Sequence, residues 1–255
     1  MLEGKTFGSA GEAVVIEEFM EGEEASVLCF TDGNTIVPMI SAQDHKRISD
    51  GDMGANTGGM GAYAPAPVMT KELDKIVYDT ILMPAVKAMK KEGCPFKGCL
   101  YAGLMITKDG PKVVEFNCRF GDPETEAVLP LLESDLAKIM LACTKGTLKK
   151  EKVEWKNACA VDVVLASEGY PATHSSGEEI VGLEEAKKTG CLVFHAGSMK
   201  KKGRYFVNGG RVLNVVAVAP TLKEAYEGVS KISWRGMQYR HDIADKGLKR
   251  LKKRK

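Results

Sequence analysis

Hydrophobic and polar positions in the first 70 residues predict β structure followed by a long loop. Residues 13–18 form an apolar run that ends in two acids and predicts a buried strand. Residues 24–30 and 35–40 are apolar segments separated by Thr-Asp-Gly-Asn, which predicts a hairpin. Residues 43–67 show no apolar period and are rich in Gly, Asp, Asn and Pro, so we expect a loop of a length that is commonly functional.

The middle of the chain predicts a hairpin between two helices. Apolar side chains recur at helical spacing in the first helix, and Pro84 predicts a kink within it. Asp109 and Gly110 join the two strands and are a strong hairpin signal. The predicted elements are a helix at residues 71–91, strands at 98–107 and 111–116, and a helix at 123–145.

Beyond the Lys-rich residues 145–152, the pattern changes to short strands. We therefore predict two domains, residues 1–148 and residues 149–255, with an α+β fold class. The first domain is expected to be an antiparallel sheet with helices, and the second to be small and rich in β structure. The predicted elements of the second domain are strands at residues 158–166, 192–195, 205–207 and 211–219, and an amphipathic helix at 221–234.

Charge is distributed unevenly along the chain. The net charge is +2, but the last ten residues hold seven Lys or Arg and no acid, so subtracting those seven leaves −5 for the rest. A mildly acidic body argues against a nucleic-acid-binding surface. We interpret the basic tail as a solvated terminus rather than as an RNA or membrane contact.

Composition indicates a cytoplasmic protein with no membrane segment. With 255 residues and 44% hydrophobic side chains, the chain can bury a sizeable core. It has no apolar run long enough to span a bilayer and no signal-peptide pattern at its start. Its seven cysteines include no CxxC pair, which is typical of reduced thiols.

A candidate metal site follows the predicted hairpin. Alternate side chains share a face in an extended strand, so Glu115 and Asn117 can offer two oxygen ligands while Arg119 faces the anion that they collect. Mg²⁺ favours such partial protein cages, completed by water and substrate phosphates. An exposed strand end with a surface salt bridge would fit these residues equally well.

A candidate nucleotide site precedes the first predicted hairpin. The backbone at residues 18–20 lies between two predicted strands, so its donors and acceptors are free for an adenine edge. The Glu24 carboxylate, at the start of the next strand, can accept both ribose hydroxyls. Taken alone, an acidic turn is more often solvent-exposed, but the candidate metal strand downstream favours the nucleotide interpretation.

These motifs resemble the glycinamide ribonucleotide synthetase family of the ATP-grasp superfamily. The resemblance runs from about residue 13 to residue 242, and its most specific segments are those at 43–47 and 56–63. It implies a partial ATP-grasp domain followed by that family's C-terminal domain. The matching segments are VIEEF at residues 15–19, GEEAS at 22–26, QDHKR at 43–47, NTGGMGAY at 56–63, LYAGLM at 100–105, EFNCRFGDPE at 115–124, HAG at 195–197 and GGRVL at 209–213.

The resemblance implies ATP-dependent ligation of glycine to 5-phosphoribosylamine through a glycyl phosphate, as in purine biosynthesis. Glu115 and Asn117 would hold Mg²⁺, or Mn²⁺ in its place, and Arg119 and Asp122 would be catalytic. The nucleotide would bind at Glu17, Glu18, Phe19, Met20 and Glu24. Such chemistry needs positioning and charge neutralisation more than a protein nucleophile.

The same resemblance assigns the loop after residue 43 to the acceptor substrates. Lys46 and Arg47 can pair with phosphate, and the loop glycines let backbone amides approach an anion. Arg211 is a candidate from the second domain, although a hairpin arginine is commonly solvated. The predicted substrate-binding residues are Asp44, Lys46, Arg47, Asn56, Thr57, Gly58, Gly59, Met60 and Arg211.

Two departures from the family pattern qualify this interpretation. Many ATP-grasp enzymes have a further acidic metal ligand near the position of Gly103, where this chain has none. The family also carries an N-terminal α/β domain and a first ATP-grasp lobe ahead of the matching residues, so we expect the chain alone to be a poor ligase. In some relatives further purine-pathway domains follow. Two alternatives stay open: another ATP-grasp carboxylate-amine ligase or carboxylase, and a non-catalytic interaction module.

Overall fold

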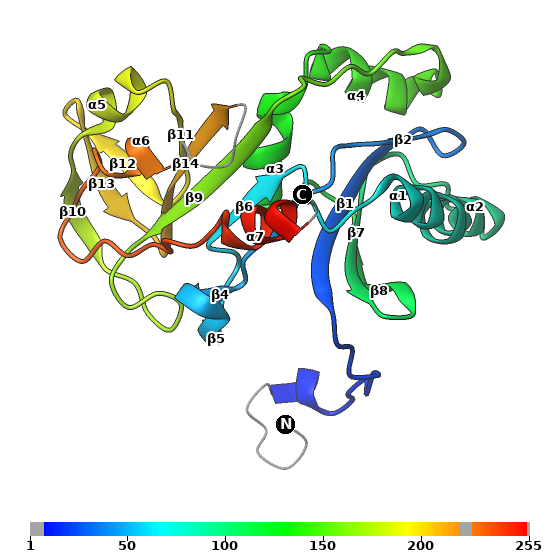
Figure 1. The fold of residues 1–255 in the computed structure, drawn as a ribbon, viewed down its shortest axis with the longest axis horizontal. Helices are drawn as coiled ribbons and strands as arrows, with labels where there is room; N and C mark the ends of the chain where they lie inside the picture. Colours follow the sequence, from blue (N-terminus) through cyan, green and yellow to red (C-terminus); the bar gives the residue numbers. More distant parts are fainter. Residues whose placement is uncertain (1–7, 220–225, 254–255) are drawn as a thin grey trace.

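The computed structural model describes residues 8–219 and 226–253. Its first half is built on a four-stranded antiparallel sheet in the order β2-β1-β7-β8 (Figure 1). The side chains of β1 alternate, so that Leu28 and Phe30 enter one hydrophobic cluster and Val27 and Cys29 enter another on the opposite face. The strands are β1 (Glu23–Thr31), β2 (Ile36–Pro38), β7 (Gly98–Thr107) and β8 (Gly110–Asn117). Both predicted hairpins are confirmed.

Helices cover both faces of this sheet. On one face lie α1 (Lys71–Val77) and α2 (Met83–Lys91), and on the other lies α4 (Leu136–Lys145). A π-helical turn at Tyr78–Leu82 joins α1 to α2. Pro84, in the first turn of α2, lacks the N–H that an uninterrupted helix would need there, so the irregular turn occurs where the proline predicted a disturbance.

A five-stranded sheet in the order β11-β14-β9-β6-β3 draws strands from both halves of the chain. Residues 61–64 of β6 pair with residues 160–163 of β9, and α3 (Glu124–Val128) packs on both strands. The domain boundary between residues 148 and 149 stays a prediction, and a continuous sheet extends across it. The strands are β3 (Gln43–Asp44), β6 (Gly61–Ala64), β9 (Cys159–Ala166), β11 (Leu192–His195) and β14 (Arg211–Ala219).

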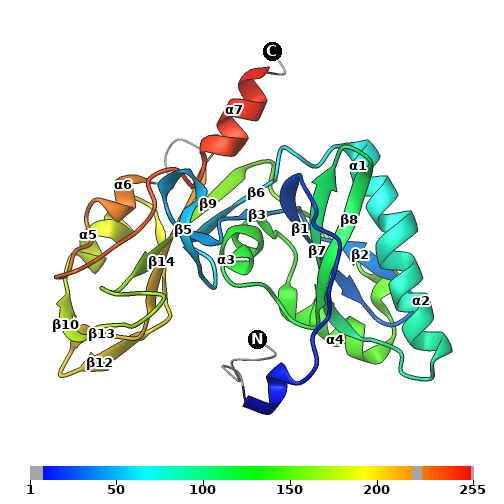
Figure 2. The same ribbon diagram turned by 90° about the horizontal axis from the view of Figure 1, so that it is seen from below.

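The remaining elements are small. A three-stranded sheet in the order β10-β13-β12 and two short helices pack near the five-stranded sheet, and α7 stands out from the body (Figure 2). They are β4 (Arg47–Ser49), β5 (Met53–Asn56), β10 (Ser176–Ile180), β12 (Ser198–Lys201), β13 (Arg204–Asn208), α5 (Leu183–Lys188), α6 (Tyr226–Val229), α7 (Asp245–Lys253), and 3-10 turns at Gly8–Gly11, Asp50–Asp52, Leu129–Leu131 and Leu148–Lys150.

The α+β fold class is confirmed, but three element predictions in the first half are wrong. Residues 13–18 are not a strand: Val15 is 85% and Ile16 92% exposed, because no strand lies alongside them in the described chain. The loop at residues 43–67 contains four short strands. The helix predicted at residues 123–145 is two helices, since a 3-10 turn containing Pro130 ends the first and Asp135 caps the second through its side chain.

In the second half, β13 and β14 follow each other but belong to different sheets. Gly209 and Gly210 permit the sharp passage between them, since a Cβ on Gly210 would lie 2.5 Å from the ring of Tyr170. Of the helix predicted at residues 221–234, residues 221–225 lie outside the described residues, α6 spans only Tyr226–Val229, and residues 230–234 are not helical. The basic tail was predicted to be solvated. Its residues 246–253 instead form most of α7, in which Lys246 pairs with Asp52 and Arg250 pairs with Glu23.

Gly61 tests the importance of the β6–β9 pairing. Its φ is +146°, and a Cβ there would lie 2.5 Å from the carbonyl oxygen of Asp162. We expect Gly61→Ala to lower the free energy of unfolding by well over about 1 kcal/mol, because backbone strain and a clash with β9 add. Gly98→Ala is the matched control, since Gly98 has φ +129° but its Cβ would meet nothing within 4 Å. Equal urea midpoints for the two variants would contradict this expectation.

Candidate active site

A cleft of about 430 Å³ opens where the four-stranded sheet meets the segment at residues 43–56. It contains most of the predicted substrate-binding residues of that segment and the predicted ribose ligand Glu24. The lining residues are Gly22, Glu23, Glu24, Gln43, Asp44, Lys46, Arg47, Asp52, Asn56, Met105 and Lys246.

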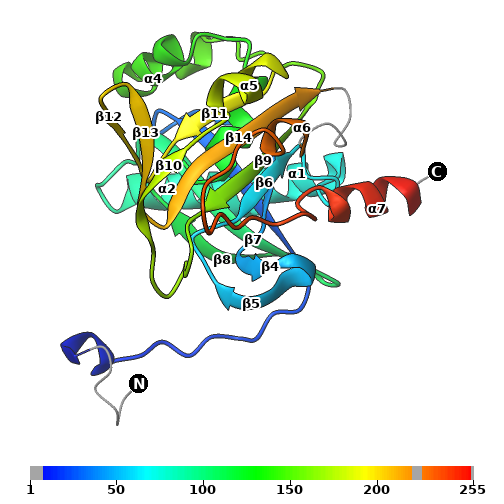
Figure 3. The same ribbon diagram turned by 90° about the vertical axis from the view of Figure 1, so that its left-hand side faces the viewer.

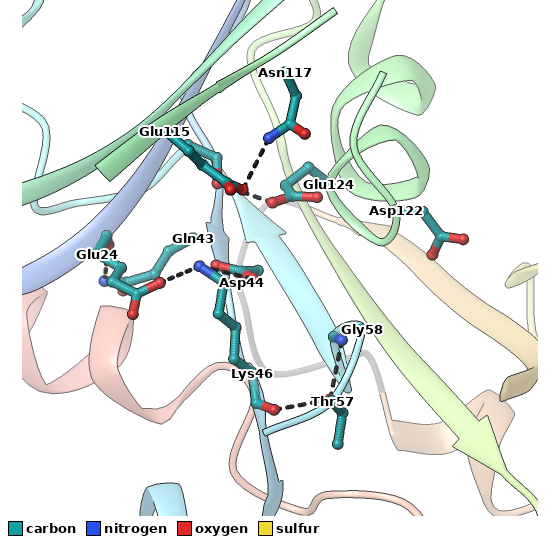
Figure 4. Close-up of polar contacts among 12 residues, drawn as sticks. Glu24, Gln43, Asp44, Lys46, Thr57, Gly58, Glu115, Asn117, Asp122 and Glu124 are labelled. Atoms are coloured by element: carbon teal, nitrogen blue, oxygen red, sulfur yellow. Dashed lines mark hydrogen bonds and ion pairs between the residues drawn. The ribbon is translucent and has the colours of Figure 1, made fainter. Parts of the chain in front are cut away.

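Lys46 and two acids form the centre of this cleft (Figure 4). The Lys46 ammonium makes an ion pair with Glu24, and its Nζ lies 3.8 Å from Oδ2 of Asp44. Asp44 is buried, and loss of solvation, reinforced by the nearby charge of Glu124, raises its pKa to about 7. Gln43 supports Glu24 from beside it, donating from Nε2 to the Glu24 carbonyl oxygen at 2.7 Å. Glu24 is therefore held in the cleft by two neighbours.

Glu124 places a buried carboxylate beside the predicted metal strand. Its Oε1 accepts hydrogen bonds from the Tyr101 hydroxyl at 2.5 Å and from Ser26 Oγ at 2.9 Å. Burial and the charge of Glu124 in turn raise the pKa of Tyr101. Gly121 leaves the room that Glu124 needs, since a Cβ there would lie 2.3 Å from Oε2. These contacts fix the orientation of the Glu124 carboxylate.

Glu115 and Asn117 extend from β8 toward Glu124 (Figure 4). Asn117 Nδ2 donates to Glu115 Oε1 at 2.9 Å, so the two predicted metal ligands lie together on one strand face. The described residues contain no cluster of three or more His, Cys, Asp or Glu arranged to hold a metal. The carboxylate and amide oxygens on β8 still fit a hard divalent ion whose other ligands are water and phosphate. Gly103 lies opposite Glu115 on β7 and contributes no acid, as the sequence indicated.

The two predicted catalytic residues lie differently. Arg119 is exposed, and its Nη1 donates to the adjacent Phe120 carbonyl oxygen at 2.9 Å. Asp122 is engaged with the second half of the chain, because its Oδ1 accepts from Arg211 Nη1 at 2.8 Å. Arg119 is thus the more available of the two arginines near this turn, because Arg211 is paired with Asp122.

Arg211 and Tyr170 hold the Thr57–Gly59 turn from the second half of the chain. Arg211 Nη1 lies 3.1 Å from the Gly58 carbonyl oxygen and 3.1 Å from that of Asp122, and Tyr170 accepts from the Gly58 N–H at 2.9 Å. Thr57 Oγ1 donates to the Lys46 carbonyl oxygen at 2.8 Å. The predicted substrate residue Arg211 therefore joins the turn at residues 57–59 to the turn at Asp122.

The remaining predicted residues lie outside the main cleft. Met60 is fully buried, and its N–H donates to the His45 carbonyl oxygen at 2.8 Å. Glu17 and Phe19 are exposed in the extended segment before β1. A second cleft of about 400 Å³ lies along that segment, where Lys112 pairs with Glu18 at 2.6 Å. It is lined by Glu18, Phe19, Met20, Glu21, Thr107, Lys108, Asp109 and Lys112.

Comparison with protein families matches both halves of the chain. Residues 1–125 match phosphoribosylglycinamide synthetase, ATP-grasp (A) domain, and residues 160–246 match phosphoribosylglycinamide synthetase, C domain. The chain belongs to the phosphoribosylglycinamide synthetase family. Within this family it is 48% identical to the phosphoribosylamine–glycine ligase of Vibrio vulnificus (strain CMCP6), over 98% of this chain and 59% of that protein.

Other proteins are also similar to the chain. The chain is 54% identical to the trifunctional purine biosynthetic protein adenosine-3 of Gallus gallus, over 97% of this chain and 25% of that protein. The crystal structure of the Thermotoga maritima phosphoribosylamine–glycine ligase superposes with a TM-score of 0.80 at 37% identity, covering 89% of this chain and 56% of that one. The chain thus spans between about a quarter and three-fifths of these relatives. A biotin carboxylase domain with a TM-score of 0.60 and 15% identity shares the fold.

Several residues that shape the candidate site were not singled out from the sequence. Glu124 ends a matching segment, but its burial against Ser26 and Tyr101 depends on strands far apart in the chain. Tyr170 and Lys246 belong to no recognisable motif.

Among the described residues, no helix is long and apolar enough to cross a membrane.

The raised pKa of Asp44 predicts a pH-dependent stability. The folded state binds this proton more tightly than the unfolded state, where the pKa is roughly 3.9, so stability is lost as pH rises from about 4 to about 7. We expect the free energy of unfolding of Asp44→Asn, relative to that of the wild type, to increase as the pH is raised from 5 to 8. The increase should be on the order of 2 kcal/mol. Urea unfolding at both pH values measures this, with the exposed Asp109→Asn as control. A difference that is independent of pH would contradict it.

Arg211 offers a second test of the site. Its removal leaves the Gly58 and Asp122 acceptors without their shared donor, so we expect Arg211→Ala to lower the free energy of unfolding by about 1–3 kcal/mol and to speed amide exchange at residues 57–59. Arg204→Ala is the matched control, because Arg204 makes one exposed ion pair, with Glu179. Unchanged exchange at residues 57–59 would show that Arg211 does not hold the turn.

Proposed function

We propose that this chain carries the catalytic metal strand and the acceptor-substrate side of an ATP-dependent phosphoribosylamine–glycine ligase. The observation that carries the proposal is the convergence of Glu24, Lys46 and Asp44 with Glu115, Asn117 and Glu124 in one region, within a chain of this family. The relatives named phosphoribosylamine–glycine ligase support the choice of substrates.

The proposed reaction has two balanced steps. A glycine carboxylate oxygen attacks the γ-phosphorus of ATP, the bond to the β–γ bridging oxygen breaks, and ADP and glycyl phosphate result. The amine of 5-phosphoribosylamine then attacks the glycyl carbonyl carbon, phosphate leaves, and the nitrogen loses a proton. Both steps concentrate negative charge on phosphoryl oxygens, which fixed cations and hydrogen-bond donors stabilise.

We assign the residues of the chain by their positions. Glu115 and Asn117 would hold Mg²⁺, which supplies charge neutralisation at the phosphates when it is bound. Arg119 is placed to neutralise charge on the transferred group. Glu24 would accept from the ribose hydroxyls, which requires its ion pair with Lys46 to loosen and frees the ammonium for a phosphoryl oxygen.

Nucleotide binding tests this proposal directly. A non-hydrolysable ATP analogue is titrated calorimetrically into the chain with Mg²⁺, and Glu115→Gln is expected to weaken binding about tenfold, because a charged ligand is lost. Glu133→Gln, at an exposed position outside both clefts, is the control. Equal affinity of the wild type and Glu115→Gln would refute the metal assignment. ADP release that requires both glycine and 5-phosphoribosylamine would identify the substrates.

A further inference from the structure

The β4–β5 hairpin at residues 47–56 has no buried residue of its own. It forms a two-stranded sheet in which β4 pairs with β5. Isolated hairpins of this kind are marginally stable in water. Its conformation must therefore come from contacts with another part of the chain.

Those contacts come from the segment that leads into α7. Arg240 is fully buried, and its Nη1 donates to Asp52 Oδ1 at 3.0 Å and to the Arg47 carbonyl oxygen at 3.2 Å. Asp242 completes the neutralisation of this guanidinium with two hydrogen bonds of 2.7 Å. Lys246 Nζ lies 2.6 Å from Asp52 Oδ2, so Asp52 joins two cations of the segment. Figure 3 shows this part of the chain passing beside β4 and β5.

Backbone groups strengthen the same contact. The Gly51 N–H donates to Asp242 Oδ2 at 2.9 Å, and the His241 N–H donates to Asp50 Oδ1 at 2.8 Å. The turn at Asp50–Asp52 is thus held by charge and by directed hydrogen bonds, in place of the apolar burial that it lacks.

The hairpin carries three residues, Arg47, Asp52 and Asn56, into the main cleft. Arg47 and Asn56 are register partners in it, and both line the cleft with Asp52 and Lys246. Within the described residues, the Arg47 side chain hydrogen-bonds to the Gly54 carbonyl oxygen and makes no ion pair. Its charge is therefore available for an anion, whereas Lys46 and Lys246 are each paired with a carboxylate.

We propose that residues 240–246 form a positioning element for the acceptor-substrate pocket, with Arg240 and Lys246 as positioning residues. They act through Asp52 and the Arg47 backbone, and they set where Arg47 meets the phosphate monoester of the acceptor. This inference rests on the proposed function only for the identity of that ligand. The contact between the two segments stands on the geometry alone.

Amide hydrogen exchange on the whole chain tests the contact. Arg240→Ala would remove the buried guanidinium that neutralises Asp52 and Asp242 and risks misfolding, so the test uses Lys246→Ala and Asp242→Asn. Both variants are expected to raise the amide exchange rate in residues 47–56 about tenfold and to leave exchange in strands β7 and β8 unchanged. Lys246→Arg is expected to keep the protection of the wild type. Lys249→Ala is the matched control, since Lys249 lies on the same helix, 76% exposed, 3.9 Å from Asp245. Unchanged exchange in both variants, or an equal rise in Lys249→Ala, would overturn the proposal.

Ribose 5-phosphate is the probe for the ligand. We expect Lys246→Ala to weaken its calorimetric affinity about tenfold while the affinity for the ATP analogue stays the same, and Lys246→Arg to bind nearly as the wild type does. If the wild type binds ribose 5-phosphate and Lys246→Ala binds it equally well, the positioning role is overturned. If the wild type does not bind the probe, the failure falls on the proposed function, and the exchange result alone decides the positioning role.

Discussion

Pairing of β6 with β9 is the contact on which the site depends. It joins a strand from the middle of the substrate segment to a strand from the second half of the chain, in the register Gly61↔Val163. As a consequence, the turn at residues 57–59 lies against Arg211 and Tyr170, and α3 brings Glu124 under the four-stranded sheet. Gly61 lies so close to the Asp162 carbonyl oxygen that no side chain would fit there. This register therefore requires glycine at position 61.

Charge is balanced locally within the site. Glu24 neutralises Lys46, Asp52 neutralises Lys246, and Asp122 neutralises Arg211. Each pair holds one element against another, which explains how exposed segments keep a defined shape with little apolar burial. A phosphorylated ligand would replace the carboxylate partner of some of these cations. The ion pairs therefore also determine which cations can contact the ligand.

Structural features that depend on neighbouring residues in the sequence were predicted correctly. The two hairpins around Asp32–Gly33 and Asp109–Gly110 follow from turn chemistry, and alternation on β8 is enough to place Glu115 beside Asn117. Features that depend on a partner far away in the sequence were not predicted. Apolar residues 13–16 predict a strand equally well whether or not a neighbouring strand exists, and short strands such as β3 and β6 have no period to detect.

The same limit applies to the site. Arg211 was recognised as a candidate, but its role in joining two turns depends on the fold, because Gly58 and Asp122 are 64 positions apart in the sequence. The basic tail was interpreted as solvated from its composition. Its first residues instead pair with Asp52 and Glu23, and no local pattern in a Lys-rich run indicates which carboxylates it meets.

We propose that a divalent ion and a nucleotide bind together at the end of β8. Paramagnetic broadening of amide resonances by Mn²⁺ with a non-hydrolysable ATP analogue measures the location of the ion without requiring turnover. We expect the strongest broadening at Glu115, Asn117 and Glu124, weaker broadening at Asp44 and Lys46, and none on β10 to β13. Broadening centred elsewhere, or equally strong without the nucleotide analogue, would contradict it.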